Sequence, residues 1–191
     1  MNQNKGRTDA GDKVNNYQVY NYTFKNLRES NMSFEEVFSR IIKFMKLNPS
    51  GNFRLMVGTD SQVHEAKTIF ITGIVIQNKG KGVWACIREV IIPRKMNFLR
   101  ERISFETSLT EEIVSMFTEE RKSQMIDIVL PYLYQGASFK LEGHLDIGAG
   151  KRNKTREFVE EMAARIGSMG FEPKIKPDAF VASSYANRFT K

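Results

Sequence analysis

The sequence predicts an α/β domain: a five-stranded mixed sheet with an extra N-terminal helix. Two observations predict it. Short apolar runs bounded by Gly, Pro and Asn indicate strands, and apolar stripes at helical spacing lie between the later runs. The expected order is a helix followed by β-β-β-α-β-α-β-α. Because a helix precedes the fourth strand, we expect that strand to cross over and pair in parallel with the first.

Residues 27–191 are expected to form a single domain. Residues 1–26 are polar and show little periodicity, so they are predicted to be a flexible N-terminal arm. The extra helix then begins at a capping box, in which Ser33 is followed by Glu36. Apolar residues recur at helical spacing as far as Met45, and a turn-forming cluster at 48–51 ends the helix.

Three strands are predicted next, and the short connections between them favour an antiparallel meander. Cys86 lies in an apolar run of the third strand and is expected to be a small buried hydrophobe. The three strands are expected over 54–62, 68–77 and 83–92.

A helical pattern extends from about Ile103 to Tyr134, with a break near Ser123. Gly136 ends this pattern. The remaining expected elements are a strand over 139–147, a helix over 154–169, a strand over 171–175 and a last helix beginning near Asp178.

Two carboxylates follow predicted strands. Asp60 ends the first strand, and Asp146 ends the fourth. An Asp after a strand is often a turn former that bonds its own backbone. If the two strands are parallel neighbours, however, both side chains lie at the carboxyl edge where open α/β sheets bind ligands. Adjacent carboxylates repel unless a cation or proton lies between them, and Mg²⁺ or Mn²⁺ suits oxygen ligands.

Further acids are candidates for the same site. Glu106 falls on the inward stripe of the helix after the third strand, and Glu112 flanks that face as a substitute. Asp178 begins the last helix, where it is either a further ligand or a plain N-cap.

Basic residues point to an anionic partner. The chain has 29 Lys and Arg against 22 Asp and Glu, a formal net charge of +7, which favours nucleic acid or a phosphorylated ligand. His144 and His64 are either proton shuttles or structural hydrogen-bonding residues. The candidate phosphate contacts, or alternatively a solvated basic turn, are Lys151, Arg152, Lys154 and Arg156.

The composition excludes some classes of protein. One cysteine cannot form an internal disulfide, and no apolar stretch resembles a signal peptide or the roughly 18 residues of a membrane helix. A cytoplasmic protein without membrane contact is therefore expected.

Four motifs surround the candidate acids: GTDSQVH at 58–64, ETSLTEE at 106–112, EGHLDIGAGKRNKT at 142–155 and KPDAFVASSYAN at 176–187. They resemble those of the YkuK family of uncharacterised bacterial proteins, within the ribonuclease H-like superfamily. The resemblance extends over nearly the whole chain from about Phe24. It implies metal-dependent phosphodiesterase or nuclease activity with two Mg²⁺ or Mn²⁺ ions. It also implies that the catalytic residues and metal ligands are Asp60, Glu106, Asp146 and Asp178.

Other functions remain open on this scaffold. One is a nucleic-acid-binding module with little or no catalysis, and another is a phosphatase or nucleotide-handling enzyme. The added N-terminal helix and the absence of a recognisable substrate-handle insertion depart from true ribonuclease H, which puts specificity for RNA–DNA hybrids in doubt.

Overall fold

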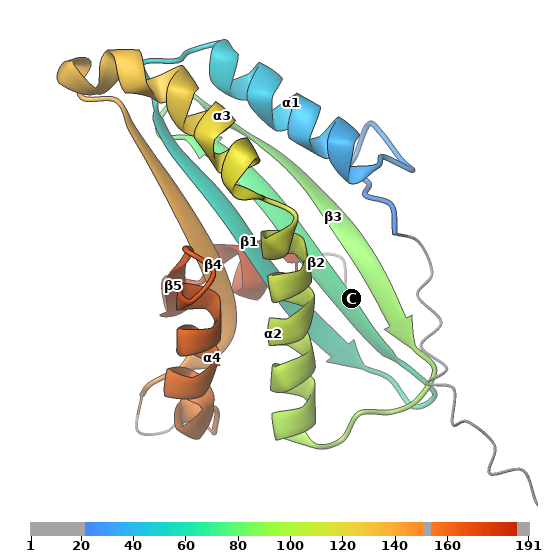
Figure 1. Cartoon of the computed structure of the whole chain (residues 1–191). Helices are drawn as coiled ribbons and strands as arrows, with labels where there is room; N and C mark the ends of the chain where they lie inside the picture. The colour runs from blue at the N-terminus through green and yellow to red at the C-terminus, as the bar shows by residue number, and fades with distance from the viewer. Residues whose placement is uncertain (1–21, 151–153, 187–191) are drawn as a thin grey trace, which may run out of the picture.

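The computed structural model describes residues 22–150 and 154–186 (Figure 1). Its core is a five-stranded mixed sheet in the order β3-β2-β1-β4-β5. β1 pairs antiparallel with β2 and β2 with β3, while β4 runs parallel to both β1 and β5. This confirms the predicted sheet and the parallel pairing of the first and fourth strands. The strands are β1 (Asn52–Val63), β2 (Thr68–Asn78), β3 (Gly82–Ile92), β4 (Ser138–Gly148) and β5 (Glu172–Lys176).

The N-terminal helix α1 begins at the predicted capping box. The backbone N–H of Glu36 donates to Ser33 Oγ at 3.2 Å, and the backbone N–H of Ser33 donates to Glu36 Oε2 at 2.8 Å. These bonds satisfy two N–H groups that a helix start otherwise leaves unpaired. The helical elements are α1 (Phe34–Lys46), α2 (Leu99–Ser115), α3 (Glu119–Val129), η1 (Leu130–Gln135), η2 (Arg156–Phe158), α4 (Val159–Gly167) and η3 (Val181–Ala186).

Some helix boundaries differ from the prediction. The break falls at 116–118, and Ser123 lies inside α3. The buried ring of Phe117 fixes this break, because it packs edge-on against Phe34 of α1 with ring centroids 5.1 Å apart. The helix expected over 154–169 starts with a short 3₁₀ turn, and its α-helical part is only Val159–Gly167.

The predicted arm also ends earlier than expected. Phe24 is buried and exchanges backbone hydrogen bonds with Met32, and Lys25 does the same with Ile87 of β3. The ring of Phe24 packs against Phe34 with centroids 6.1 Å apart. Part of the segment 1–26 is therefore fixed to the domain, and residues 1–21 lie outside the described residues.

The two faces of the sheet are covered unequally. Alternate residues of β1, such as Leu55 and Val57, pack in the main core with Ile41 of α1, and Gly143 of β4 lies against Ile166 of α4 on this face. The intervening residue Met56 packs on the other face. Figure 1 shows α1, α2, α3 and α4 on one side of the sheet.

A short segment, η3, covers the centre of the second face. Val181 of η3 packs against Met56 of β1 and Val75 of β2. Gly73 permits this close approach, because a Cβ there would lie 2.9 Å from both Val181 Cγ1 and Tyr185 Cδ1. In the described part of the chain, η3 covers the second face from Met56 and Val75 to Ile71 and Ile87. Among the described residues, no helix has the length and apolar character needed to cross a membrane.

Candidate active site

The structure brings Asp60 and Asp146 together. Thr59 of β1 pairs with Leu145 of β4, so the next residue on each strand places the two acids side by side. The spacing of neighbouring strands is about 4.8 Å. The pKa of Asp60 is raised to about 6, first because its carboxylate is partly buried and second because Asp146 repels its charge. Lys176 and Arg102 oppose this shift.

Asp146 is only partly neutralised. Its Oδ2 accepts a hydrogen bond from Lys176 Nζ of β5 at 2.9 Å. Its Oδ1 is buried, and no donor among the described residues reaches it. Because a buried carboxylate oxygen without a partner is costly, this atom is open to a cation or a water molecule.

Glu106 reaches the same end of β1 from α2. Ser61 Oγ donates to Glu106 Oε1 at 2.5 Å, and Arg102 Nε lies 3.9 Å from that oxygen. Burial raises the pKa of Glu106 to about 8. The Ser61 hydrogen bond and Arg102 oppose the shift, while the charges of Asp60 and Asp146 add to it. Three acids from three elements therefore act on one another electrostatically.

Asp178 is not part of this group. It lies exposed in a bend before η3, and its backbone N–H donates to Ile175 O at 2.8 Å. It lines a groove with Arg54 of β1. The charge of Asp178 acts on Arg54, whereas the main contributions to the pKa shifts of Asp60 and Glu106 come from other groups. Asp178 therefore precedes the last helical segment, as expected, but it lines the groove instead of joining the acid pair, because the chain turns back after β5 before η3 starts.

Glu112 does not substitute for Glu106. Its carboxylate forms a two-pronged ion pair with Arg88 of β3, with N–O distances of 2.7 and 2.9 Å. The Arg88 side chain is 1% exposed, so Glu112 supplies the charge that compensates a buried guanidinium. Helical spacing placed both glutamates near the sheet, but only Glu106 lies beside Ser61 and the acid pair.

His144 is a structural residue and not a proton shuttle. It is fully buried, and its Nδ1 accepts a hydrogen bond from the backbone N–H of Val181 at 3.0 Å. Its Nε2 therefore carries the proton and faces Glu142 Oε2 at 3.1 Å. Burial lowers the pKa of His144, so the neutral ring is favoured. Glu142 in turn accepts two hydrogen bonds from Arg54, at 2.9 and 2.6 Å.

Among the described residues, the cations that act on the acids are Lys176 and Arg102, which were not among the predicted phosphate contacts. A signal existed for each: Lys176 ends the strand after Asp146, and Arg102 stands one helical turn before Glu106. Lys154 and Arg156 are exposed and line a pocket with Glu157 and Glu160. Lys151 and Arg152 lie outside the described residues.

The carboxylates partly fit a divalent cation. In the described chain no group of three His, Cys, Asp or Glu side chains is close enough to hold a metal ion. Asp60 and Asp146 nevertheless supply adjacent oxygen ligands of the kind that Mg²⁺ and Mn²⁺ prefer. Asp146 Oδ1 has no partner among the described residues, and the pKa of Asp60 is raised. Both observations indicate that the described cations do not fully neutralise the two carboxylates.

A Glu106→Gln variant is expected to be more stable than the wild type at alkaline pH. Since the folded-state pKa of Glu106 is raised to about 8 from 4.5, folding favours the protonated acid. That stabilisation is complete below the unfolded pKa and is lost as pH rises through about 8. Near pH 9 we expect the variant to gain about 3–6 °C in Tm, from roughly 1–2 kcal/mol.

Thermal unfolding followed by circular dichroism between about pH 5 and pH 9 measures this effect. Glu160→Gln on the exposed surface of α4 is the control and should follow the wild-type pH profile. Equal pH slopes for Glu106→Gln and the wild type would contradict a raised pKa at this residue.

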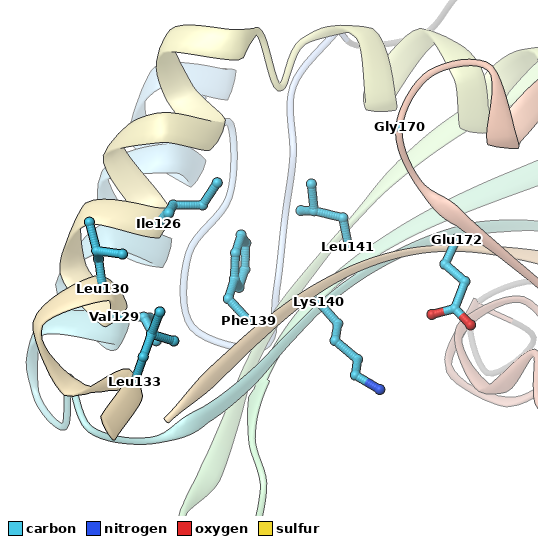
Figure 2. Close-up of a pocket in the computed structure, with 9 residues that line it drawn as sticks. All are labelled: Ile126, Val129, Leu130, Leu133, Phe139, Lys140, Leu141, Gly170 and Glu172. Carbon is cyan, nitrogen blue, oxygen red and sulfur yellow. The ribbon is translucent and has the colours of Figure 1, made fainter. Parts of the chain in front are cut away.

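A separate pocket of about 400 Å³ lies between α3, η1 and the start of β4. Figure 2 shows that Ile126, Leu130 and Phe139 point toward this space, whereas Lys140 points to the other side of β4. Its charged lining residues are Lys140 and Glu172. The described lining of this apolar pocket offers no pair of acids.

Comparison with known proteins supports the family suggested by the motifs. The sequence model described as Ribonuclease H-like matches residues 36–191. The chain is 41% identical over 170 residues to the protein named "Uncharacterized protein YkuK" from Bacillus subtilis (strain 168), which covers 89% of this chain and 98% of that protein. No solved structure matches. This chain belongs to the YkuK family, within the ribonuclease H-like superfamily.

Proposed function

We propose that this protein is a metal-dependent nuclease that hydrolyses phosphodiester bonds in nucleic acid. The observation that carries the proposal is the Asp60–Asp146 pair at the carboxyl edge of adjacent parallel strands, with Asp146 Oδ1 unpartnered among the described residues. Open α/β sheets place their ligands at this edge. Membership of the ribonuclease H-like superfamily is a further reason, by analogy of fold, to expect phosphodiester chemistry.

Each residue of the site has a role in this proposal. Asp60 and Asp146 would hold Mg²⁺ or Mn²⁺. Glu106 is the third acid, on the helix side of β1. Its pKa is raised to about 8, so its side chain is protonated at pH 7, and a cation bound beside it would favour the carboxylate. When bound, two such ions supply an activated water and stabilise the leaving oxygen. Ser61 fixes Glu106 through its short hydrogen bond, so that the carboxylate stays at the end of the strand.

Basic residues close to the acids contact the phosphates. Of the described cations, Lys176 and Arg102 pair with the acids, and the phosphates of a polyanion can replace the carboxylates in these ion pairs. Lys95 is exposed on the segment that leads into α2, beside the 77% exposed Phe98, and Arg100 is exposed in the first turn of α2. A cationic segment with an exposed aromatic ring is suited to phosphates and an unstacked base.

Cleavage assays test this proposal. Labelled single-stranded RNA, single-stranded DNA, duplex DNA and RNA–DNA hybrid are incubated with the protein in Mn²⁺, in Mg²⁺ and in EDTA. We expect cleavage of at least one of these substrates in Mn²⁺ or Mg²⁺ and none in EDTA. Metal-independent cleavage, or no cleavage of any substrate in either metal, would count against a metal-dependent nuclease.

A nucleic-acid-binding module with little catalysis is the second candidate. Two observations favour it: Lys176 already neutralises one oxygen of Asp146, and Asp178 lies away from the acid pair. This function requires salt-sensitive binding in EDTA that survives the loss of Asp60. Binding of that kind, without cleavage in the assay above, would establish it.

A further inference from the structure

A polar groove occupies the uncovered part of the second sheet face. It has a volume of about 930 Å³ and is formed by the first residues of β1 and β4, the end of β2 and the loop after β5. Among the residues that the structure describes, η3 packs over Met56, Val75 and the residues toward Ile71, and none of them covers this end of the sheet. Figure 2 shows Lys140 pointing away from the apolar pocket on the helix-covered side. The lining includes Asn52, Arg54, Gln77, Lys79, Lys140 and Lys174.

The groove carries uncompensated positive charge. Lys79 and Lys140 are exposed and form no ion pair with any described residue. Arg54 is paired with Glu142, which lies beneath it with 2% of its side chain exposed. This pairing fixes the guanidinium at the floor of the groove, and 38% of its side chain stays exposed. Asp178 is the remaining acid of the lining.

An exposed aromatic ring lies at the rim. Phe180 is 50% exposed although it lies just before the buried Val181. Asn52 and Gln77 add amide groups to the same lining. Aromatic rings beside a cationic groove are the usual platforms for single-stranded nucleic acid, since every base presents a face that can stack.

We infer that this groove binds a single-stranded segment of nucleic acid, with phosphates on Lys79 and Lys140 and a base stacked on Phe180. The inference rests on the proposed function in its choice of ligand, and it assigns a second contact region beyond the acid site. β5 connects the two regions: Lys174 lines the groove, and Lys176 contacts Asp146. Two residues along a strand correspond to about 6.6 Å. Lys174 pairs with Glu172 and Lys176 with Asp146, so a phosphate that displaces these carboxylates would find two neighbouring ammonium groups between the groove and the acids.

Fluorescence anisotropy in EDTA tests the groove without any cleavage. The probes are a short labelled single-stranded oligonucleotide and the duplex of the same sequence. We expect the double variant Lys79→Glu/Lys140→Glu to bind the single strand at least about 10-fold more weakly than the wild type and to show a shallower salt dependence. We expect Phe180→Ala to lose about 5- to 100-fold, while Phe180→Trp retains binding.

The matched control is Lys43→Glu/Lys46→Glu, which makes the same change of charge on α1 at the opposite face of the sheet. It should weaken binding much less than the groove variant. The proposal that the groove binds single-stranded nucleic acid would be overturned if Lys79→Glu/Lys140→Glu kept wild-type affinity. It would also be overturned if the α1 control lost as much affinity as the groove variant. If the wild type cleaves nucleic acid but the groove variants bind as tightly as the wild type, the proposed role of the groove is refuted and the nuclease is not. If binding depends on the groove but no cleavage occurs, only the nuclease is refuted.

Discussion

Asp60→Asn is expected to reduce metal-dependent cleavage by at least about 100-fold, the scale on which an essential electrostatic group acts in catalysis. Asn keeps the shape of the side chain but removes the negative charge beside Asp146, and with it the ligand that we assign to the cation. The initial rate of cleavage in Mn²⁺, measured with the best substrate of the wild type, is the readout. A variant as active as the wild type would contradict the role of the acid pair.

The stability of Asp60→Asn separates lost chemistry from lost folding. The folded-state pKa of Asp60 is raised to about 6 from 3.8, so folding favours the protonated form. This stabilisation is complete below pH 3.8 and is lost as pH rises through about 6. At about pH 8 in EDTA the wild type therefore contains a disfavoured charge, and we expect the variant to have an equal or higher Tm. A large fall in Tm would mean that the loss of activity reports unfolding.

Glu112→Ala is expected to destabilise the fold by about 3 kcal/mol, which corresponds to a fall in Tm of about 6–12 °C. The destabilisation comes from Arg88, the partner of Glu112, and not from the loss of the glutamate side chain itself. Glu112 is half-exposed, but Arg88 is 1% exposed on its side chain and would be left as a buried charge without its carboxylate. Denaturation by urea, followed by circular dichroism, measures the loss of stability.

A second variant tests the mechanism of this destabilisation. Replacing both partners, in Arg88→Met/Glu112→Leu, removes the buried charge and should recover most of the lost stability. Metal-dependent cleavage per folded molecule should be unchanged in Glu112→Ala, because Glu112 contacts Arg88 and not Ser61 or the acid pair. Loss of cleavage at temperatures where Glu112→Ala is folded would place Glu112 in the site and contradict the assignment of Glu106.

The sheet was predictable because its signals are local. The apolar run that ends at Asp60 and the run that ends at Asp146 each mark a strand, and the intervening helix requires a crossover connection. The resulting register, with Thr59 beside Leu145, confirms the predicted parallel neighbours. Helical periodicity also predicted that Glu106 lies on the face of its helix that packs on the sheet. Periodicity did not find the break at Phe117, because the apolar stripe continues through it and only packing against α1 shows where the chain turns.

The site shows the same division between local and distant information. Spacing along α2 predicted that Glu106 and Glu112 both lie near the sheet, with Glu106 as the first candidate ligand. Contacts with distant residues decided between them, because Glu106 bonds Ser61 of β1 whereas Glu112 pairs with Arg88 of β3. His144 shares a strand face with Asp146, but the backbone N–H of Val181 fixes its ring as part of the core. Asp178 follows a strand as Asp60 does, and the turn after β5 carries it to the groove.

The sequence by itself determined the antiparallel meander, the crossover and the placement of two acids at one edge of the sheet, because each of these follows from local hydrophobic period and connection length. The place of β5 beside β4 was found only in the structure. The tertiary structure decided which charges compensate which, and it left one end of the second sheet face open with lysines along it. Such pairings depend on side chains that are far apart in the chain, and only folding sets their distances and their exclusion from water.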